Sequence, residues 1–176
     1  MEKHLKERYF NYKLYENTVY WDDKTVCFQL YSLTGNFVGF QKYTPSASKK
    51  PNNKEHGRYY TYITKPYIGF FGVHTLHWNN GPIFLCEGIF DICRFHNKSY
   101  AGLAVFSNNP KHLRNSIDFL KQTKRPIITV CDGDKAGKML AKYGTFSISC
   151  PENKDAGELT ESELDNILTQ ALKKIN

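Results

Sequence analysis

Four acidic residues close to the ends of two short apolar stretches are the first candidates for chemistry. They are Glu87, Asp91, Asp132 and Asp134. The stretches, Ile83–Cys86 and Ile127–Cys131, fit buried strands of a parallel sheet, and open α/β sheets place their sites at the carboxyl ends of such strands. Like charges this close together would keep some carboxyl groups protonated unless a cation neutralised them. The pattern therefore predicts a divalent metal ion held by carboxylate oxygens.

The elements that must position these acids alternate between strand and helix from residue 82 onward. The expected strands are Ile83–Cys86, Ala101–Phe106, Ile127–Cys131 and Thr145–Ser149. The expected helices are Ile89–Asn97, Pro110–Thr123, Lys135–Tyr143 and Glu161–Lys174, with Asn109 and Thr160 as N-cap residues of the second and fourth. Glu163 completes a capping box with Thr160. Such alternation predicts parallel strands joined by right-handed crossovers.

The first 80 residues have a different pattern, with many aromatic residues and few helix signals. The expected strands are Thr25–Tyr31, Phe37–Tyr43 and Arg58–Thr64, while Leu5–Leu14 fits a short helix or, nearly as well, a strand. We therefore expect an α/β protein in two parts: a small, mostly β, basic subdomain over residues 1–80 and a parallel α/β domain over residues 81–176.

The formal net charge is +7, and most of the excess lies in the first half of the chain. Residues 1–80 carry 11 Lys and Arg against 6 Asp and Glu, whereas residues 81–176 carry 13 against 11. Within residues 42–65, six basic side chains face one acid, Glu55. This balance favours a polyanionic partner, most plausibly nucleic acid, although a basic surface kept for solubility fits the charge equally well.

The five cysteines form no CxxC pair, so no zinc site is expected. They indicate small buried side chains in a reducing compartment, and His74 and His77 are interpreted as ordinary loop or surface residues. We find no signal peptide and no apolar run long enough to span a bilayer. The expected location is therefore the cytosol, without a membrane partner.

The second half of the chain resembles a Toprim domain, the metal-binding α/β module of bacterial-type primases, type IA and type II topoisomerases and certain nucleases. The likeness rests on Glu87-Gly88 after one strand and Asp132-x-Asp134 after another. Asp91, the string Asp-Gly-Asp-Lys-Ala-Gly over residues 132–137, and the later Lys154-Asp155 pair are similar to the primase branch. In the first half, aromatic and glycine segments around residues 37–40, 58–60 and 70–72 are loosely similar to the basic subdomain of that branch. Over about residues 25–160, the chain resembles a reduced DnaG or phage primase catalytic core.

The resemblance implies nucleotidyl transfer with Mg²⁺ or Mn²⁺, in which a 3′-hydroxyl attacks the α-phosphate of a nucleoside triphosphate. It implies that Asp132 and Asp134 bind metal directly, that Asp155 and Asp91 serve a second metal, and that Glu87 is a general acid/base or an additional ligand. Lys135 would neutralise a triphosphate at a helix N-terminus. Lys138, on the same helix, is either a solvated lysine or a contact to nucleic acid.

The basic first half would then hold a single-stranded DNA template. Its candidate phosphate contacts are Lys42, Lys49, Lys50, Arg58 and Lys65, and its candidate stacking residues are Tyr43, Tyr59, Tyr60 and Tyr62. The alternating spacing of the tyrosines fits core packing of at least half of them equally well.

Primer synthesis on single-stranded DNA is the function that these residues favour. The short chain suggests a phage or mobile-element version that works with a separate zinc-module protein or helicase, because the zinc-ribbon pairs and helicase modules of such primases are not recognised in it. Two alternatives stay open. One is a Toprim nuclease that hydrolyses phosphodiesters, and the other is a non-catalytic nucleic-acid-binding subunit of a replication complex.

Overall fold

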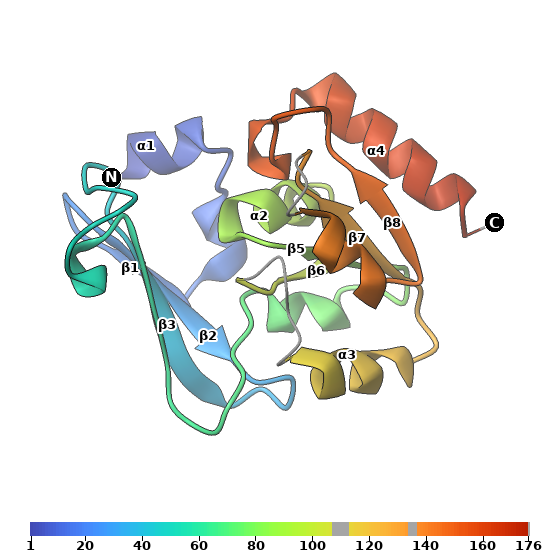
Figure 1. Ribbon diagram of the computed structural model, residues 1–176, viewed down its shortest axis with the longest axis horizontal. Helices are drawn as coiled ribbons and strands as arrows, with labels where there is room; N and C mark the ends of the chain where they lie inside the picture. The colour runs from blue at the N-terminus through green and yellow to red at the C-terminus, as the bar shows by residue number, and fades with distance from the viewer. Residues whose placement is uncertain (107–112, 134–136, 176) are drawn as a thin grey trace. The chain divides into compact units, whose positions relative to one another are not determined.

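The computed structural model describes residues 1–106, 113–133 and 137–175, with the side chains of residues 137 and 138 left out (Figure 1). The chain divides into two compact units, Met1–Phe71 and Gly72–Asn176. The division expected near residue 80 lies inside the second unit. Residues 72–80 belong to that unit because hydrogen bonds hold them there: the Thr75 side chain donates from Oγ1 to the carbonyl of Gly102, and the Arg125 guanidinium donates to the carbonyl of Leu76.

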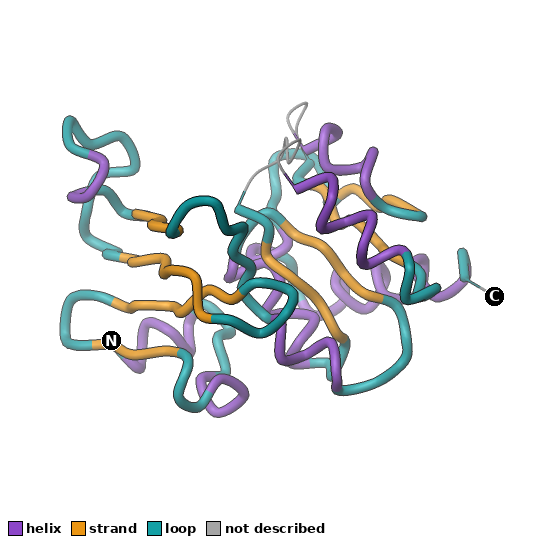
Figure 2. Tube along the Cα trace, turned by 90° about the horizontal axis from the view of Figure 1, so that it is seen from below, coloured by secondary structure: helices purple, strands orange, loops and turns teal. Residues whose placement is uncertain are grey.

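Unit 1 is built on an antiparallel sheet of four strands in the order β1-β2-β3-β4 (Figure 2). The strands are β1 (Val19–Trp21), β2 (Val26–Tyr31), β3 (Phe37–Tyr43) and β4 (Tyr59–Ile63). Every second residue of β2 is buried, as the apolar alternation predicts. One face of the sheet therefore packs in a core, and the other carries partly exposed side chains.

The core of unit 1 is aromatic and is closed by the N-terminal segment. That segment contains helix α1 (Glu2–Glu7) and the 3₁₀ helix η1 (Tyr12–Tyr15), while a further 3₁₀ helix, η2 (Lys54–His56), lies between β3 and β4. The ring of Phe10 stacks on Tyr15 at 4.7 Å and meets Phe28 edge-on at 5.3 Å, while Tyr15 lies 4.9 Å from Phe71. These close ring pairs give the small unit a dense core.

Unit 2 contains a parallel sheet of four strands in the order β6-β5-β7-β8. The strands are β5 (Ile83–Cys86), β6 (Ala101–Ala104), β7 (Ile127–Cys131) and β8 (Phe146–Ser149). The helices are α2 (Ile89–Asn97), α3 (Arg114–Lys121) and α4 (Glu161–Lys173), with 3₁₀ helices η3 (Val73–His77), η5 (Gly137–Tyr143) and η6 (Ala156–Glu158). Every residue of β5, β6 and β7 is buried, which explains their continuous apolar sequences.

The strand order gives unit 2 a defined place for a site. From β5 the chain goes to β6 on one side, and then returns to β7 and β8 on the other. Strand β5 is therefore the point at which the order reverses, and ligands of open α/β sheets bind beyond the carboxyl ends of strands at such a point. Glu87 directly follows β5, and Asp132 directly follows β7.

Several sequence predictions need correction at the level of elements. The expected helix Leu5–Leu14 is wrong, because α1 ends at Glu7 and Tyr9 adopts a left-handed φ of 55° that turns Phe10 into the core. Gly137–Tyr143 is a 3₁₀ helix rather than an α-helix, and the strand expected to reach Phe106 ends at Ala104. The start of the helix expected from Pro110, with its N-cap Asn109, lies outside the described residues. Among the described residues, no helix is long and apolar enough to cross a membrane.

Candidate active site

The turn between β5 and α2 positions the first two acids. Gly88 is the N-cap of α2, and Asp91 is the third residue of the helix. The Asp91 carboxylate turns back toward the start of the helix, where Oδ2 accepts a hydrogen bond of 2.8 Å from the Gly88 backbone N–H. This is the acidic half of a capping box, and the positive end of the helix dipole favours a negative charge there. Asp91 is thus held in place by the helix that follows β5.

The second oxygen of Asp91 contacts a segment 66 residues further along the chain. Its Oδ1 accepts a hydrogen bond of 3.0 Å from the backbone N–H of Gly157. The residue is only 8% exposed. Burial, followed by the negative charges of Asp155 and Asp132, raises the pKa of Asp91 to about 7, although the two amide hydrogen bonds act in the opposite direction. The three carboxylates therefore share one region of low polarity.

Asp155 lies beside Asp91 through the same glycine. It is the N-cap of η6, and the 3₁₀ turn brings Gly157 back toward the carboxylates. A Cβ atom placed on Gly157 would lie 3.1 Å from Asp91 Oδ1 and 3.2 Å from Asp155 Oδ1. Both acids thus face one backbone position, where a side chain would crowd them.

The loops after β7 and β8 are in direct backbone contact, which brings Asp132 to the same sheet edge. The Gly133 N–H donates to the carbonyl of Lys154 at 2.9 Å. A Cβ atom on Gly133 would lie 1.9 Å from the carbonyl oxygen of Pro151, so only glycine allows this approach. The glycine of the Asp-Gly-Asp string therefore holds together the two loops that carry Asp132 and Asp155.

Three buried cysteines lie close to these acidic residues. Cys86 and Cys131 end β5 and β7, Cys150 directly follows β8, and all three are buried. Burial raises the pKa of each thiol, and with the charges of Asp132, Asp91 and Asp155 it raises the pKa of Cys150 to about 12. The thiols are therefore uncharged, as the sequence prediction of buried hydrophobic cysteines requires, and they make the base of the site apolar.

Of the five predicted metal-site acids, Asp91 and Asp155 lie beside one glycine, Gly157, and the charge of Asp132 reaches Asp91. Glu87 lies half-buried at the same strand end, where its backbone carbonyl accepts from Phe106 N at 2.8 Å. Asp134 and Lys135 lie outside the described residues, as does the side chain of Lys138. Within the described part of the chain, no three His, Cys, Asp or Glu side chains are arranged to hold a metal ion. The roles of these residues as ligands or catalytic groups stay predictions.

The donor chemistry nevertheless fits a hard divalent cation. The groups that converge are carboxylates, whose oxygens Mg²⁺ and Mn²⁺ prefer, whereas the neighbouring thiols are protonated and buried. The raised pKa of Asp91 comes first from its burial and then from the negative charges of Asp155 and Asp132. A cation at this edge would lower that pKa and keep the carboxylates ionised.

The predicted nucleic-acid contacts of unit 1 differ in how far they reach solvent. The Lys42 ammonium donates to the carbonyl of Glu55 at 2.8 Å, and Arg58 Nε donates to the carbonyl of Ala47 at 3.1 Å. Both side chains thus fold the loop between β3 and β4 onto the sheet, while Lys65 is exposed. Of the tyrosines, Tyr43 is buried at 4% exposure and stacks on Tyr59, as the core-packing alternative predicts.

Two residues that the sequence analysis did not single out, Arg94 and Gly157, help to hold the acidic residues in place. Arg94 is 1% exposed and donates to the carbonyl of Leu159 at 2.7 Å and to Glu161 Oε1 at 2.8 Å. It ties α2 to the segment that contains Gly157. The available signal was an arginine in the segment Ile89–Phe95, whose other residues apart from Asp91 are apolar, since a buried cation needs a fixed partner. The contact of Gly157 has no signal in local sequence.

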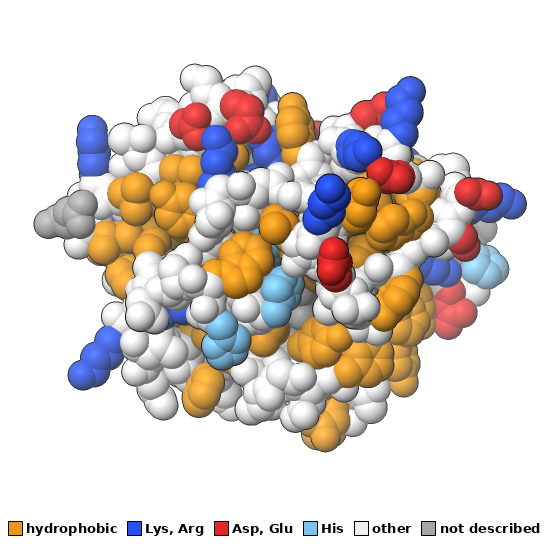
Figure 3. Space-filling view, turned by 180° about the vertical axis from the view of Figure 1, so that it is seen from behind, with side chains coloured by type: hydrophobic (Ala, Val, Ile, Leu, Met, Phe, Trp, Pro, Cys, Tyr) orange, Lys and Arg blue, Asp and Glu red, His pale blue; other side chains and the backbone are white. Residues whose placement is uncertain are grey.

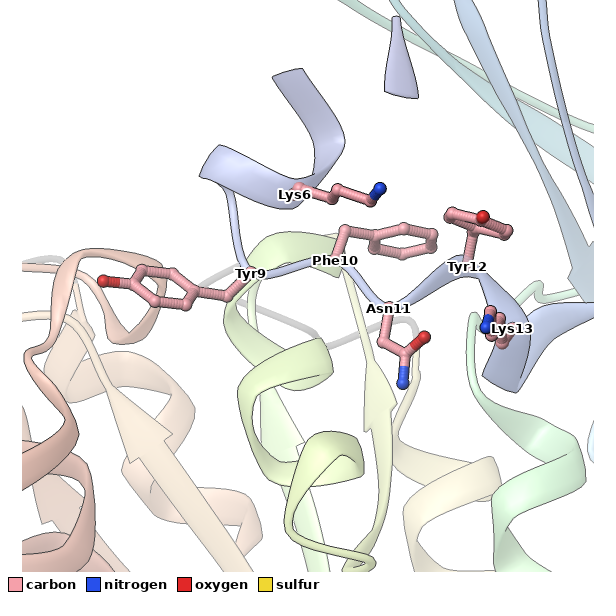
Figure 4. Close-up of a pocket in the computed structure, with 6 residues that line it drawn as sticks. All are labelled: Lys6, Tyr9, Phe10, Asn11, Tyr12 and Lys13. Atoms are coloured by element: carbon pink, nitrogen blue, oxygen red, sulfur yellow. The ribbon is translucent and has the colours of Figure 1, made fainter. Parts of the chain in front are cut away.

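The rest of the described surface offers weaker candidates for a functional site than the acidic residues do. On the face shown in Figure 3, basic and acidic side chains are interspersed among hydrophobic ones, so this face is not uniformly positive. A surface pocket in unit 1 is lined by side chains of one short segment, residues 6–13 (Figure 4). Two of its polar groups are already bound, because the Lys6 ammonium and the Tyr12 hydroxyl contact Glu2 at 2.8 and 3.2 Å.

Comparison with known proteins supports the fold and not a family assignment by sequence. No protein-family model matches the chain, and no curated protein matches it. Solved structures of primase cores do match. The DnaG primase catalytic domain bound to single-stranded DNA aligns with a TM-score of 0.66 and 14% identity, covering 96% of this chain and 73% of that one.

Two further matches come from named organisms. The Aquifex aeolicus primase, with its zinc-binding and RNA polymerase domains, aligns with a TM-score of 0.62 and 18% identity over 98% of this chain and 48% of that one. The RNA polymerase domain of Mycobacterium tuberculosis primase DnaG in complex with double-stranded DNA aligns with a TM-score of 0.59 and 16% identity, over 96% and 63%. The chain thus has the fold of primase catalytic cores, with a Toprim-type parallel sheet preceded by a small β subdomain, and spans about half to three-quarters of their length.

Proposed function

We propose that this chain is the catalytic core of a DNA primase that joins ribonucleoside triphosphates into short RNA primers on a single-stranded DNA template. The observation that supports the proposal is the position of Glu87 and Asp132 directly after β5 and β7 of a primase-type fold, with Asp91 and Asp155 both beside Gly157. Acidic residues at those ends are what phosphoryl-transfer chemistry with a divalent metal requires.

The carboxylates would divide the work according to their surroundings. Asp132, with Asp134, would hold Mg²⁺ or Mn²⁺, and Asp155 would support a second position. The metal would supply neutralisation of the charge that develops on the attacking and leaving oxygens. Asp91, whose two oxygens already accept backbone N–H groups, would order the loop of Asp155 and use its remaining lone pairs toward metal or water. Glu87 would move the proton of the 3′-hydroxyl or act as a further ligand.

The remaining groups would bind substrates. Lys135 and Lys138 would hold the triphosphate or the nucleic acid, and the basic loop of unit 1 would hold the template strand. Further partners would be a helicase or a zinc-module protein of a phage- or mobile-element-type system. The reaction would take place in the cytosol, where the five free cysteines stay reduced.

Primer synthesis on single-stranded DNA with labelled ribonucleoside triphosphates tests the proposal. The full chain is assayed with Mg²⁺ or Mn²⁺ and with EDTA, beside Glu87→Gln and Asp132→Asn. Asp118→Asn, an exposed acid on α3 that pairs with Lys121 at 3.5 Å, is the matched control. We expect short, template-dependent RNA from the wild type and the control, and none from the two site variants or in EDTA.

Two other outcomes would replace the proposal. Metal-dependent cutting of the template or of RNA, lost in both site variants, would identify a Toprim nuclease. Absence of both activities, with salt-sensitive binding of single-stranded DNA, would identify a non-catalytic subunit.

A further inference from the structure

Arg94 is a buried charged residue that the proposed reaction does not use. It lies on α2 one turn after Asp91, and only 1% of it is exposed. A guanidinium leaves water at a cost in free energy unless its N–H groups are hydrogen-bonded. Nη1 donates to the carbonyl of Leu159 at 2.7 Å, and Nη2 donates to Glu161 Oε1 at 2.8 Å. Because Leu159 directly follows η6 and Glu161 begins α4, Arg94 fixes the segment between these helices against α2.

Asp91 holds the same segment from the same face of α2. Side chains three residues apart on a helix are neighbours. Asp91 Oδ1 accepts from the Gly157 N–H at 3.0 Å, two residues before the carbonyl that Arg94 binds. The helix therefore holds this segment at two points, through one acceptor and one donor. We call these four residues, Asp91, Arg94, Gly157 and Leu159, the α2 clamp.

The α2 clamp holds the turn that begins with Asp155. This residue is the N-cap of η6, a three-residue helix in which the Glu158 N–H donates to the Asp155 carbonyl at 3.2 Å. So short a helix has little of its own to fix its distance from α2. The start of the loop is tied to the loop after β7, where the Gly133 N–H donates to the carbonyl of Lys154 at 2.9 Å. With its start tied there and its end held by the α2 clamp, the loop keeps the Asp155 carboxylate on the side of Asp91.

We propose that Arg94 is a positioning residue for the divalent cation: through the α2 clamp it holds Asp155 at the distance from Asp91 at which both carboxylates serve one cation. The inference rests on the proposed function, which assigns these two acids to the metal. Arg94 acts through Leu159 and Gly157 rather than by contact with the reacting groups. Lysine cannot replace it fully, because a single nitrogen takes the place of the planar fork that binds two acceptors at once.

The test is Mn²⁺ binding to the full chain without nucleotide or DNA, measured by electron paramagnetic resonance of the free ion. Arg94→Lys keeps the charge and Arg94→Met removes it, and in both we expect the Mn²⁺ Kd to rise at least about tenfold. Loss of a positive charge alone would tighten cation binding, so weaker binding in Arg94→Met identifies a change in geometry.

Lys98→Gln is the matched control. Lys98 bonds the same Glu161 at 3.1 Å but lies outside the α2 clamp, and its replacement also removes one positive charge. Its Mn²⁺ Kd should stay within about twofold of the wild type, since a partly exposed ion pair contributes little.

The metal dependence of primer synthesis separates positioning from a loss of folded protein. In Arg94→Lys, the Mg²⁺ concentration for half-maximal synthesis should rise about tenfold, while the rate at saturating Mg²⁺ stays within about threefold of the wild type. A destabilised protein would instead lose rate at every Mg²⁺ concentration and keep the half-maximal value. Circular-dichroism melts select a temperature at which the variants are folded. If Arg94→Met is folded at none, Arg94→Lys is compared with Lys98→Gln alone.

Three results would overturn the inference. The first is an Mn²⁺ Kd in both Arg94 variants equal to that of the wild type. The second is equal weakening in Lys98→Gln, which would indicate general loosening around Glu161, and the third is the absence of saturable Mn²⁺ binding by the wild type. A wild type that binds Mn²⁺ with the expected difference between variants but makes no primers would leave the inference standing and refute the proposed reaction alone.

Discussion

The two sheets of this protein leave their side chains available in different ways. The parallel sheet of unit 2 is buried along β5, β6 and β7, so its acidic residues occur where the strands end. The antiparallel sheet of unit 1 buries one side only, and its other side carries rings and Lys42. A sheet covered on both faces concentrates chemistry at its edge, whereas a half-covered sheet offers an area. Under the proposed function, the first sheet would position the reacting groups and the second would belong to the unit that holds the template.

The largest expected effect is the loss of primer synthesis when an acidic residue of unit 2 is replaced. It tests whether the reaction depends on that unit. Asp132→Asn should lower primer synthesis at least about 100-fold, because it weakens the site for a metal that neutralises the reacting phosphate. In metal-free buffer its melting temperature should stay level or rise, since Asp91 and Asp155 lose a repulsive neighbour. Activity assays and thermal melts on the same preparation measure both. A large fall in melting temperature would instead make Asp132 a structural residue.

The next effect concerns the contact between the loops of unit 2. Gly133→Ala would place a methyl group 1.9 Å from the Pro151 carbonyl oxygen, so the two loops must separate. We expect a loss of about 3 kcal/mol in the free energy of unfolding, together with loss of primer synthesis. Urea titration measures the first. Gly35→Ala in unit 1, where nothing lies within 4 Å of the added atom, is the control, with a cost of about 1 kcal/mol from its positive φ.

The buried Asp91 predicts a pH effect confined to unit 2. Its pKa is about 7 in the folded protein against an ordinary 3.8, so the folded state binds more protons than the unfolded state between these values. Its contribution to stability is complete below about pH 4 and is lost as the pH rises through about 7. The contribution of His96 to stability has the opposite pH dependence. Burial lowers its pKa from 6.5 to about 3, so its contribution grows as the pH rises toward 6.5.

Comparison with Asp91→Asn isolates the carboxyl group, because His96 is the same in both proteins. From pH 6 to pH 8, the stability advantage of the metal-free wild type over Asp91→Asn should fall by about 1 kcal/mol. Urea titrations at the two pH values measure the difference. A constant difference would show that Asp91 stays ionised throughout, and Mg²⁺ should produce that behaviour if it binds beside this group.

Much of the fold follows from the sequence where local signals agree. Strands β5 and β7 and helix α2 have the bounds predicted, because an apolar run of strand length is followed by a turn and, for α2, by a helix-starting residue. The capping box of Thr160 and Glu163 is confirmed, with hydrogen bonds of 2.8 and 3.2 Å. The N-terminal helix was wrong because tertiary packing of Phe10 overrides local helix propensity.

The candidate site was predictable in its acids but not in what holds them. The strand-end positions of Glu87 and Asp132 follow from parallel-sheet topology. The hydrogen bond from Gly157 to Asp91 joins residues that no periodicity relates, and the burial of Arg94 depends on a carbonyl at Leu159. The hydrogen bonds of Lys42 and Arg58 to loop carbonyls likewise have no signal in the sequence. Contacts to backbone groups far away in the chain cannot be predicted from the types of the residues that make them.

The smallest expected effect is that of a substitution on the outer side of the unit 1 sheet, opposite its core. It should leave the fold unchanged. Tyr62→Thr should alter the free energy of unfolding by no more than about 0.5 kcal/mol, since Tyr62 is 48% exposed and threonine favours strands. Ile128→Thr, in β7 and fully buried, should cost about 2–3 kcal/mol because it replaces a buried ethyl group by a hydroxyl. Urea titration of both variants decides the matter. If Tyr62→Thr costs as much as Ile128→Thr, the outer side of the antiparallel sheet is packed rather than open, and the distinction between an edge for chemistry and an area for binding fails.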